Sequence, residues 1–387
     1  MERNARYCFF FQRGVEFDRC NTKQEVSKTM AKKYNFYAGP AILPQEVMKK
    51  AQDELLDFNG IGLSIMEISH RSKDFDAVIT TAEAKIRSLL GVPENYTVMF
   101  LQGGASLQFG MLPMNLLIGK KADYVHTGEW AKKAIKEAKL FGQVNVAASS
   151  EDKNFSYIPD KFNFSPDARY VHITSNETIG GVQFSKFPET GNVPLVIDMS
   201  SDIFSRSIDF KNIGMIYAGA QKNIGPAGVT LVIMRNDLVE ACADGLTTML
   251  SYKTHAKEKS LYNTPPCFAI YIIKLVMDWI EGLGGLEAVE KINEQKARAI
   301  YDAIDHSGGY YRGTAAPKDR SKMNVTFRLP SEELEEKFIN EAKKAGFIGL
   351  KGHRSVGGCR ASIYNAMGLE GVQALVQFME KFARDNK

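Results

Sequence analysis

Short apolar segments alternate with helical patterns along most of this chain, and this alternation restricts the folds that it can adopt. Buried strands separated by helices are typical of a mostly parallel sheet that helices cover on both faces. The sequence therefore predicts an α/β fold. The expected strands lie at residues 97–101, 122–126, 170–174, 195–197, 215–217 and 230–234, with a helix at 130–141 after the second of them.

Helical patterns continue on both sides of these expected strands. An early helix is expected at 45–59, because Val47, Ala51, Leu55 and Phe58 recur at helical spacing before a glycine-rich break. The later part of the chain is expected to form a helix at 268–281, a second one that ends near residue 306, a strand at 323–329, a helix at 332–345, a strand at 360–364 and a helix at 371–383.

The change of pattern in this later part predicts two domains. We expect a large α/β domain at 45–291 and a smaller α+β domain at 292–387. Residues 30–44 are expected to pack with the smaller domain. Residues 1–29 read unlike the rest, and Met30 opens a segment that resembles a natural start, so we expect a dispensable N-terminal extension.

Composition argues against several classes of function. Lys and Arg number 49 and Asp and Glu 45, without a long basic block, so no dominant attraction to nucleic acid or an anionic membrane is expected. The five cysteines include no CxxC pair, which argues against a zinc site or a disulfide framework. No apolar run is long enough for a signal peptide or a membrane span, and we expect a cytoplasmic protein without a bound metal.

A lysine and an aspartate stand where ligands of open α/β sheets bind, beyond the carboxyl ends of the strands. Asp198 directly follows the apolar run at 195–197, and Lys222 stands in AGAQKNIGPAG between two expected strands. Such an aspartate is often only a cap or turn residue, and such a lysine is often a surface residue. A partly desolvated lysine in the sheet crevice, however, has a lowered pKa and can form a Schiff base with a carbonyl.

These residues match what pyridoxal phosphate needs: a lysine for the aldehyde, a carboxylate opposite the pyridinium nitrogen and a cradle for the phosphate. The segment GGAS at 103–106 follows a strand and opens a helix, so its N–H groups and the helix dipole favour a phosphate. A GG turn alone is often mere geometry. Trp130, at the start of another helix, could stack on the cofactor ring or simply pack in the core.

Cationic residues gather at two other places, in SHR at 69–71 and in GHR at 352–354 followed by Arg360. Arginine binds carboxylates and phosphates through two parallel hydrogen bonds. Solvated surface arginines are the common case, yet Arg354 and Arg360 lie on either side of two glycines that permit a close approach. Together these cations suit a substrate with several negative charges.

Eight segments from about residue 35 to the C-terminus carry a resemblance: FYAGPAILP, SIMEISHRSKDF, FLQGGASLQF, SNETIGG, YAGAQKNIGPAG, NTPPCF, MNVTF and LKGHRSVGGCRASIYNAM. They resemble the phosphoserine aminotransferase family, in the order of that family. The resemblance implies a class-V, fold-type I pyridoxal-phosphate enzyme with a mostly parallel seven-stranded sheet. It implies a homodimer that transfers the amino group reversibly between L-glutamate and 3-phosphohydroxypyruvate, giving O-phospho-L-serine and 2-oxoglutarate in L-serine biosynthesis. Many bacterial relatives also use 4-phosphohydroxy-L-threonine in pyridoxine biosynthesis.

The resemblance also implies roles for single residues. Lys222 matches the lysine that bonds to the cofactor and moves a proton from the substrate, and Asp198 matches the carboxylate that keeps the ring nitrogen protonated. With Trp130, stacked on the ring, they are the expected catalytic residues. The remaining cofactor-binding positions are Thr178 near the phenolic oxygen and, around the phosphate, Ala105, Ser106, Gln221, Asn263 and Thr264, the last two from the partner subunit.

The substrate-binding positions follow from the same resemblance. Arg360 matches the residue that binds the α-carboxylate, and His70, Arg71, His353 and Arg354 match the cations that bind the substrate's phosphate, some of them across the dimer. Some family members carry arginine where this chain has serine at 106. Here the backbone N–H groups must therefore carry more of the contact with the cofactor's phosphate.

Two other functions remain open at this point. The first is another fold-type I enzyme, either a different aminotransferase or a cysteine desulfurase. A desulfurase needs a mobile nucleophilic cysteine. Cys359 is the only cysteine in the cation-rich loop, but a small packing residue is expected directly before Arg360. A catalytically silent protein that binds a phosphate ligand is the other. The joint presence of Lys222 and Asp198 on successive strand ends argues against it.

Overall fold

A computed structural model describes residues 33–386 of the chain. The expected N-terminal extension at 1–29 lies outside these residues, as do the first residues of the expected segment 30–44. Within 33–386, no helix combines the length and the apolar character that crossing a membrane requires.

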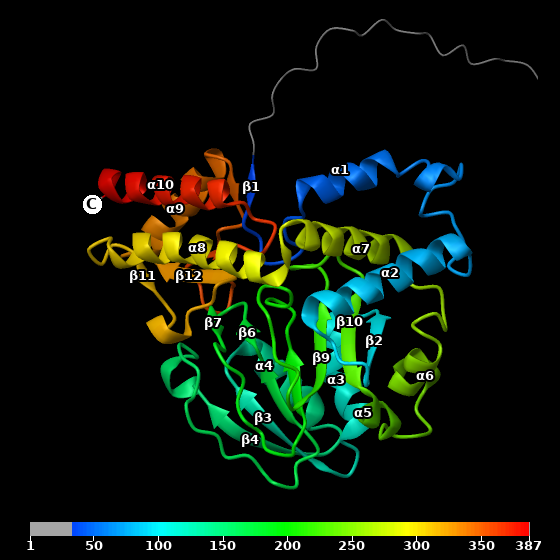
Figure 1. Cartoon of the computed structure of the whole chain (residues 1–387). Helices are drawn as coiled ribbons and strands as arrows, with labels where there is room; N and C mark the ends of the chain where they lie inside the picture. Colours follow the sequence, from blue (N-terminus) through cyan, green and yellow to red (C-terminus); the bar gives the residue numbers. More distant parts are fainter. Residues whose placement is uncertain (1–32, 387) are drawn as a thin grey trace, which may run out of the picture. The chain divides into compact units, whose positions relative to one another are not determined.

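A seven-stranded sheet forms the centre of the fold (Figure 1). Its strand order is β2-β10-β9-β8-β5-β3-β4, and every pairing is parallel except those of β10 with β2 and with β9. The mostly parallel sheet expected from the sequence is therefore confirmed. Its strands are β2 (Tyr96–Leu101), β3 (Lys121–His126), β4 (Gln143–Ser149), β5 (Val171–Thr174), β8 (Leu195–Asp198), β9 (Ile213–Gly219) and β10 (Thr230–Arg235).

Helices cover both faces of this sheet because successive side chains of a strand point to opposite faces. In β2, Val98 and Phe100 join an apolar cluster with the helices α2 and α7, whereas Met99 and Leu101 join a second cluster with α3 and α4. Burial on both faces explains why these strands read as continuous apolar runs. The four helices are α2 (Lys73–Leu90), α3 (Gly104–Leu116), α4 (Glu129–Ala138) and α7 (Cys267–Gly282).

A three-stranded antiparallel sheet with its own apolar cluster follows in the C-terminal part (Figure 1). The helices α8, α9 and α10 contribute to this cluster, and so does Phe36, which follows the parallel pair of β1 with β13. The expected late strands and helices are thus present. Their bounds are β1 (Tyr34–Asn35), α8 (Gly285–Asp305), β11 (Arg312–Gly313), β12 (Asn324–Arg328), α9 (Glu332–Lys344), β13 (Phe347–Ile348), β14 (Cys359–Ser362) and α10 (Leu369–Asp385).

The early helix differs from the expectation, because α1 (Gln45–Asp53) ends six residues before 59. Glu54 is buried and accepts a hydrogen bond from the Tyr271 hydroxyl, and Asn59 has a φ of 53°, which lies outside the range of a right-handed α-helix. The apolar spacing persisted although the backbone had turned, so the prediction of a helix over 54–59 was wrong. The expected helix at 130–141 likewise ends at Ala138. The remaining short elements are β6 (Asn176–Glu177), β7 (Val182–Gln183), α5 (Asn236–Glu240), α6 (Tyr252–Lys257) and four 3-10 turns, Phe58–Gly60, Glu151–Lys153, Thr248–Leu250 and Pro317–Asp319.

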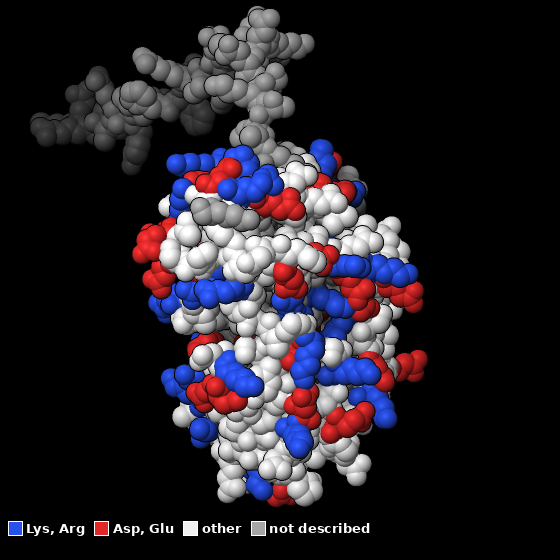
Figure 2. Space-filling model, turned by 90° about the vertical axis from the view of Figure 1, so that its left-hand side faces the viewer, with Lys and Arg blue, Asp and Glu red and all other residues white. Residues whose placement is uncertain are grey.

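Acidic and basic side chains are mixed over the face that Figure 2 shows. Some exposed charges of the chain pair directly, as Lys318 does with Asp160, whose oxygens lie 2.8 Å from its Nζ. Exposed pairs of this kind contribute only about 0–1 kcal/mol to stability. Because acidic and basic side chains alternate on the face in Figure 2, this face presents no extended area of one charge sign.

Candidate active site

A small cavity of about 90 Å³ lies where the central strands of the sheet end. It is bounded by the end of β8, the loop after β9 and the N-termini of α3 and α4. The structure thus gathers in one place side chains that are far apart in the sequence. Seven residues expected to bind a cofactor line it: Ala105, Ser106, Trp130, Thr178, Asp198, Gln221 and Lys222.

Lys222 is the cation of this cavity. It stands in the loop between β9 and β10, and its Nζ donates a hydrogen bond of 2.7 Å to Thr178 Oγ1. Burial lowers the pKa of this amine to about 8, although the carboxylates of Asp198 and Glu177 pull it upward. At pH 7 roughly a tenth of the amine is therefore neutral, far more than at the ordinary lysine pKa of about 10.4, and a nucleophile or a base requires this neutral form.

We predict that the rate at which the cofactor-free protein bonds to pyridoxal phosphate rises with pH and levels off above about 8. Below that pH, protonation removes the lone pair of Lys222 that must attack the aldehyde, so the rate falls with decreasing pH. Stopped-flow absorbance over a pH series measures this profile. A rate that still climbs tenfold per pH unit near the ordinary pKa of lysine, about 10.4, would contradict the prediction.

Asp198 is the last residue of β8, and its carboxylate is buried. Its Oδ1 accepts a hydrogen bond of 2.9 Å from the N–H of Ser200. Burial raises the pKa of this carboxyl, while the bonds from Ser200 and the charge of Lys222 lower it again. The side chain is therefore held in one place, and as a carboxylate it can keep a proton on a ring nitrogen of a bound ligand.

The N-terminus of α3 forms the third wall of the cavity. Gly103 and Gly104 have φ of 86° and 64°, which glycine adopts without strain. A Cβ at Gly103 would lie 2.6 Å from Leu107 Cδ2, so the turn also requires a residue without a side chain. The first N–H groups of a helix have no partner within the helix, and its dipole favours an anion there. This end suits a phosphate group.

Polar atoms around the cavity remain available to a ligand. Among the described residues, Thr174 Oγ1, Asn176 Oδ1 and Trp130 Nε1 are buried without a hydrogen-bond partner. Thr174 and Asn176 were not expected from the sequence, although both stand at or just after the end of the apolar run at 170–174. Together with Lys222, Asp198 and the helix end, this donor set fits pyridoxal phosphate.

Arg360, on β14, connects this cavity with a larger one of about 460 Å³. Its Nη1 donates a hydrogen bond of 3.2 Å to the carbonyl oxygen of Thr178, the residue whose hydroxyl binds Lys222. His353 also lines the larger cavity, and among its described lining residues none is acidic. The cavity therefore suits an anionic substrate, as expected. Arg354 lines neither cavity and is exposed.

Four expected site residues do not reach either cavity of their own chain. They are Asn263 and Thr264, after α6, and His70 and Arg71, before α2. They lie near one another, since Thr264 Oγ1 is 3.4 Å from His70 Nδ1. A place in the active site thus requires that a second chain present them.

Cys359 is a poor nucleophile in this structure. Its side chain is 2% exposed and packs in the apolar cluster of the C-terminal part. Burial raises the pKa of its thiol well above the ordinary value, so the reactive thiolate is disfavoured. The packing role expected from the sequence accounts for this residue, and a desulfurase that depends on it is disfavoured.

The chain is similar to known aminotransferases in both sequence and fold. The family model described as aminotransferase class-V matches residues 33–375. The phosphoserine aminotransferase of Desulfosudis oleivorans is 60% identical over 356 residues, which cover 91% of this chain and 98% of that relative. A solved phosphoserine aminotransferase from Bacillus circulans subsp. alkalophilus is 56% identical, with a TM-score of 0.91 over 92% of this chain and 99% of that one. A pyridoxal-phosphate-bound phosphoserine aminotransferase from Trichomonas vaginalis is 40% identical, with a TM-score of 0.86 over 90% and 100%.

Proposed function

The chain belongs to the class-V aminotransferase family and, within it, to the phosphoserine aminotransferases, and from this membership we propose how its residues perform the reaction. It is a pyridoxal-phosphate-dependent enzyme that transfers the amino group reversibly between L-glutamate and 3-phosphohydroxypyruvate, giving O-phospho-L-serine and 2-oxoglutarate in L-serine biosynthesis. One observation carries this function. Lys222, buried and with a pKa of about 8, shares a cavity with the carboxylate of Asp198 and the N-terminus of α3.

The residues around the small cavity divide the work at the cofactor. Pyridoxal phosphate, when bound, supplies an aldehyde for the substrate's amino group and a ring that spreads the charge developing at Cα. The neutral amine of Lys222 takes the proton from Cα and returns it on the other side of the C–N bond. Thr178 holds this amine, and Asp198 keeps a proton on the ring nitrogen. Trp130 covers the ring, and Ala105, Ser106 and Gln221 hold the phosphate.

The cations beside the larger cavity orient the substrate. Arg360, fixed by the carbonyl of Thr178, binds the α-carboxylate so that Cα lies near Lys222. His353 and Arg354 bind the substrate's phosphate together with residues of a partner subunit. Burial and the neighbouring arginines lower the pKa of His353, so this imidazole acts mainly as a neutral hydrogen-bond donor.

This function predicts a strong preference for a phosphorylated amino acid. We expect O-phospho-L-serine to discharge the visible absorption band of the bound cofactor at least ~100-fold faster than L-serine does, because several charged hydrogen bonds to the phosphate are lost with L-serine. Single-turnover absorbance measures both rates. L-Alanine serves as a second control, and a bound cofactor that responds best to it would indicate another aminotransferase. A protein that binds no cofactor would favour the silent binding protein.

We also propose that the enzyme is a homodimer with active sites at its interface. An apolar surface at residues 56–66 supports this, since Leu56 is 85% exposed and Met66 60% exposed. His70 and Arg71 follow directly, close to Thr264, and none of the three reaches a cavity of its own chain. A second copy that covers this surface would bring these residues to the other chain's site.

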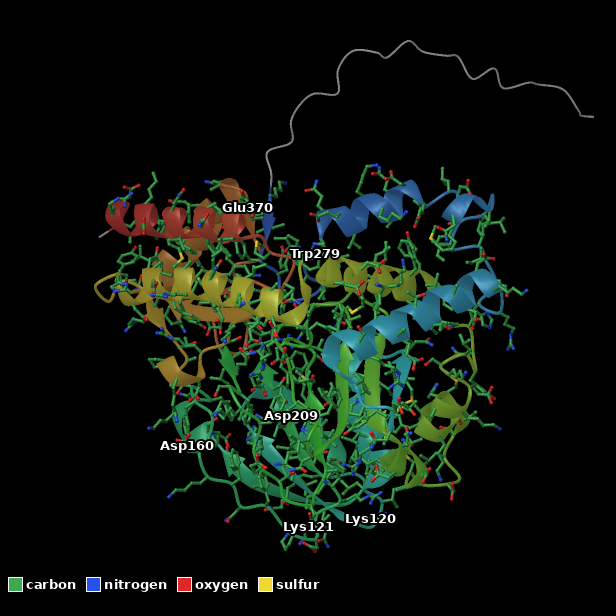
Figure 3. All side chains as sticks on the ribbon, in the orientation of Figure 1. Lys120, Lys121, Asp160, Asp209, Trp279 and Glu370 are labelled. Carbon is green, nitrogen blue, oxygen red and sulfur yellow. The ribbon has the colours of Figure 1, made fainter. Side chains whose placement is uncertain are left out.

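The double variant Leu56→Glu/Met66→Glu is expected to be mainly monomeric at micromolar concentration and inactive, because two carboxylates cannot be buried in an apolar interface. Sedimentation velocity gives the oligomeric state. Leu140→Glu is the matched control, since Leu140 is 73% exposed and lies two residues before Gly142, which lies against the Lys120 backbone. Lys120 lies at the opposite end of the molecule from α1, which the segment 56–66 follows (Figure 3). A double variant that remains a dimer would reject this interface.

Three further assignments belong to the same proposal. Residues 45–291 form the domain that holds the cofactor, and 292–387 form the domain that supplies the arginine that binds the substrate. Of the segment 30–44, the described residues 33–44 pack with the second domain. The enzyme acts in the cytoplasm. Because the phosphate-binding cations do not depend on the carbon chain, it also converts 4-phosphohydroxy-L-threonine of the pyridoxine pathway. Comparison of kcat/KM for this substrate and O-phospho-L-serine tests the last assignment.

A further inference from the structure

Glu177 is a fully buried carboxylate that none of the roles above uses. It ends the short strand β6, directly before Thr178. Its Oε1 accepts a hydrogen bond of 3.0 Å from the N–H of Ala131, and its Oε2 accepts one of 3.3 Å from the N–H of Trp130. Both donors belong to the first turn of α4, so a residue 46–47 positions away binds this helix end.

The chain makes room for this carboxylate at Gly128. A Cβ at that position would lie 2.5 Å from Glu177 Cδ, so any other residue would displace the glutamate. Helix N-termini are ordinarily capped by the side chain of the residue that precedes them, a serine, threonine, aspartate or asparagine. At this helix that residue is a glycine without a side chain, and Glu177 takes over the task.

A capping role alone does not explain why a carboxyl group is buried so close to the catalytic lysine. Burial raises the pKa of Glu177 to about 7, while the two N–H bonds and the charge of Lys222 lower it and the charge of Asp198 raises it. Burying a carboxylate is costly and calls for compensation. The compensation comes from groups of the active site, and Trp130, whose first-turn N–H is bound, places its ring centroid 5.5 Å from Lys222 Nζ.

We propose that Glu177 is a positioning residue of this enzyme, which fixes the first turn of α4 and thereby holds the Trp130 ring over the cofactor site. Glu177 and Thr178 then act as one unit. The first sets the ring that covers the cofactor, while the second binds Lys222 through its hydroxyl and Arg360 through its carbonyl. The inference rests on the proposed function only in that the cofactor binds at Lys222.

The test observes Trp130 directly, in a Trp279→Phe background. The chain has two tryptophans, and Trp279 lies in α7, which packs on the opposite face of the sheet from α4 (Figure 3). Trp130 is then the only indole. We expect Glu177→Ala to increase the mobility of this indole in the cofactor-free protein, measured by fluorescence anisotropy decay, and to raise the dissociation constant of pyridoxal phosphate about tenfold.

Two variants separate positioning from a general effect of charge or folding. Glu177→Gln keeps one acceptor oxygen, so we expect it to restore most of the Trp130 signal and of the cofactor affinity. Glu129→Gln removes a carboxylate that belongs to the first turn of α4, the turn that Glu177 binds. Among the described residues, the Glu129 side chain has no hydrogen bond. This variant should match the parent protein. Gly128→Ala should resemble Glu177→Ala, and combining the two should add nothing.

The proposal is overturned if Glu177→Ala leaves both the Trp130 anisotropy and the cofactor affinity unchanged, or if Glu129→Gln changes them equally. Should the alanine variant fail to fold, Glu177→Gln decides. Any loss of cofactor affinity in this variant must then be accompanied by greater mobility of the Trp130 indole. A parent protein that never binds pyridoxal phosphate would reject the proposed function, yet the anisotropy of the cofactor-free variants would still decide the role of Glu177.

Discussion

Replacing Lys222 by alanine is expected to lower kcat for the transfer between O-phospho-L-serine and 2-oxoglutarate by at least ~10⁴-fold. The variant loses the amine that bonds to the cofactor and the base that moves the proton at Cα. No described side chain can replace it, since among the residues that line the small cavity Lys222 is the only amine. A coupled assay of glutamate formation measures the loss, and substantial remaining turnover would sink the assignment.

A small primary amine tests whether this loss is chemical. Ethylamine can enter the space that the side chain vacates and accept the proton, so we expect it to restore part of the rate in Lys222→Ala and to leave the parent enzyme unaffected. Thermal unfolding followed by circular dichroism shows whether the variant is folded. A folded variant that no amine rescues would indicate that Lys222 has a structural rather than a chemical task.

The central residues of the site were predictable because one rule of sheet architecture locates them. Ligands bind beyond the carboxyl ends of parallel strands. Asp198 is the last residue of β8, and Lys222 follows the end of β9 by three residues. The GGAS turn followed from the same rule together with the dipole of the next helix. Local sequence thus sufficed wherever a strand end itself carries the functional group.

Glu177 could not be found in this way, because nothing in its neighbourhood shows what it binds. Its partners are backbone N–H groups 46–47 residues earlier, and the glycine that makes room for it looks like an ordinary turn residue.

Two elements of the large sheet and its helices were also not expected, for different reasons. The edge strand β4 is only partly buried and lacks an apolar run, so its sequence does not indicate a strand. Helix α2 has Ser72 as its cap and an apolar stripe, so its sequence does indicate a helix, which the expectations omit.

The arrangement of the cations shows a different limit. His70 and Thr264 are neighbours in the structure, but no pattern within one chain can place them beside Lys222 when they do not reach it. Only the resemblance to the family implied that a partner subunit presents them. Physical reasoning from the sequence finds groups that the fold of one chain brings together, and it has no access to a site completed by another chain.

Asp198→Asn is expected to lower kcat by roughly 10²–10⁴-fold with a folded protein. The asparagine carbonyl can still accept the N–H of Ser200, which lies 2.9 Å from Asp198 Oδ1, so the local turn survives. A neutral amide cannot hold a proton on the ring nitrogen, and the charge developing at Cα loses its stabilisation. The pKa of Lys222 should also fall below about 8, because Asp198 is the carboxylate that raises it most.

Asp202→Asn is the matched control for this variant. Asp202 is equally buried, burial raises its pKa too, and its carboxylate accepts hydrogen bonds from Ser175 and Gln183, but it does not line the small cavity. We expect it to lower stability and to change kcat by less than about tenfold, because its charge acts on Lys222 only from a distance. Single-turnover rates with O-phospho-L-serine over a pH series compare the two. If both variants lost activity equally, the negative charge near Lys222, rather than contact with the ring nitrogen, would be what the reaction needs from Asp198.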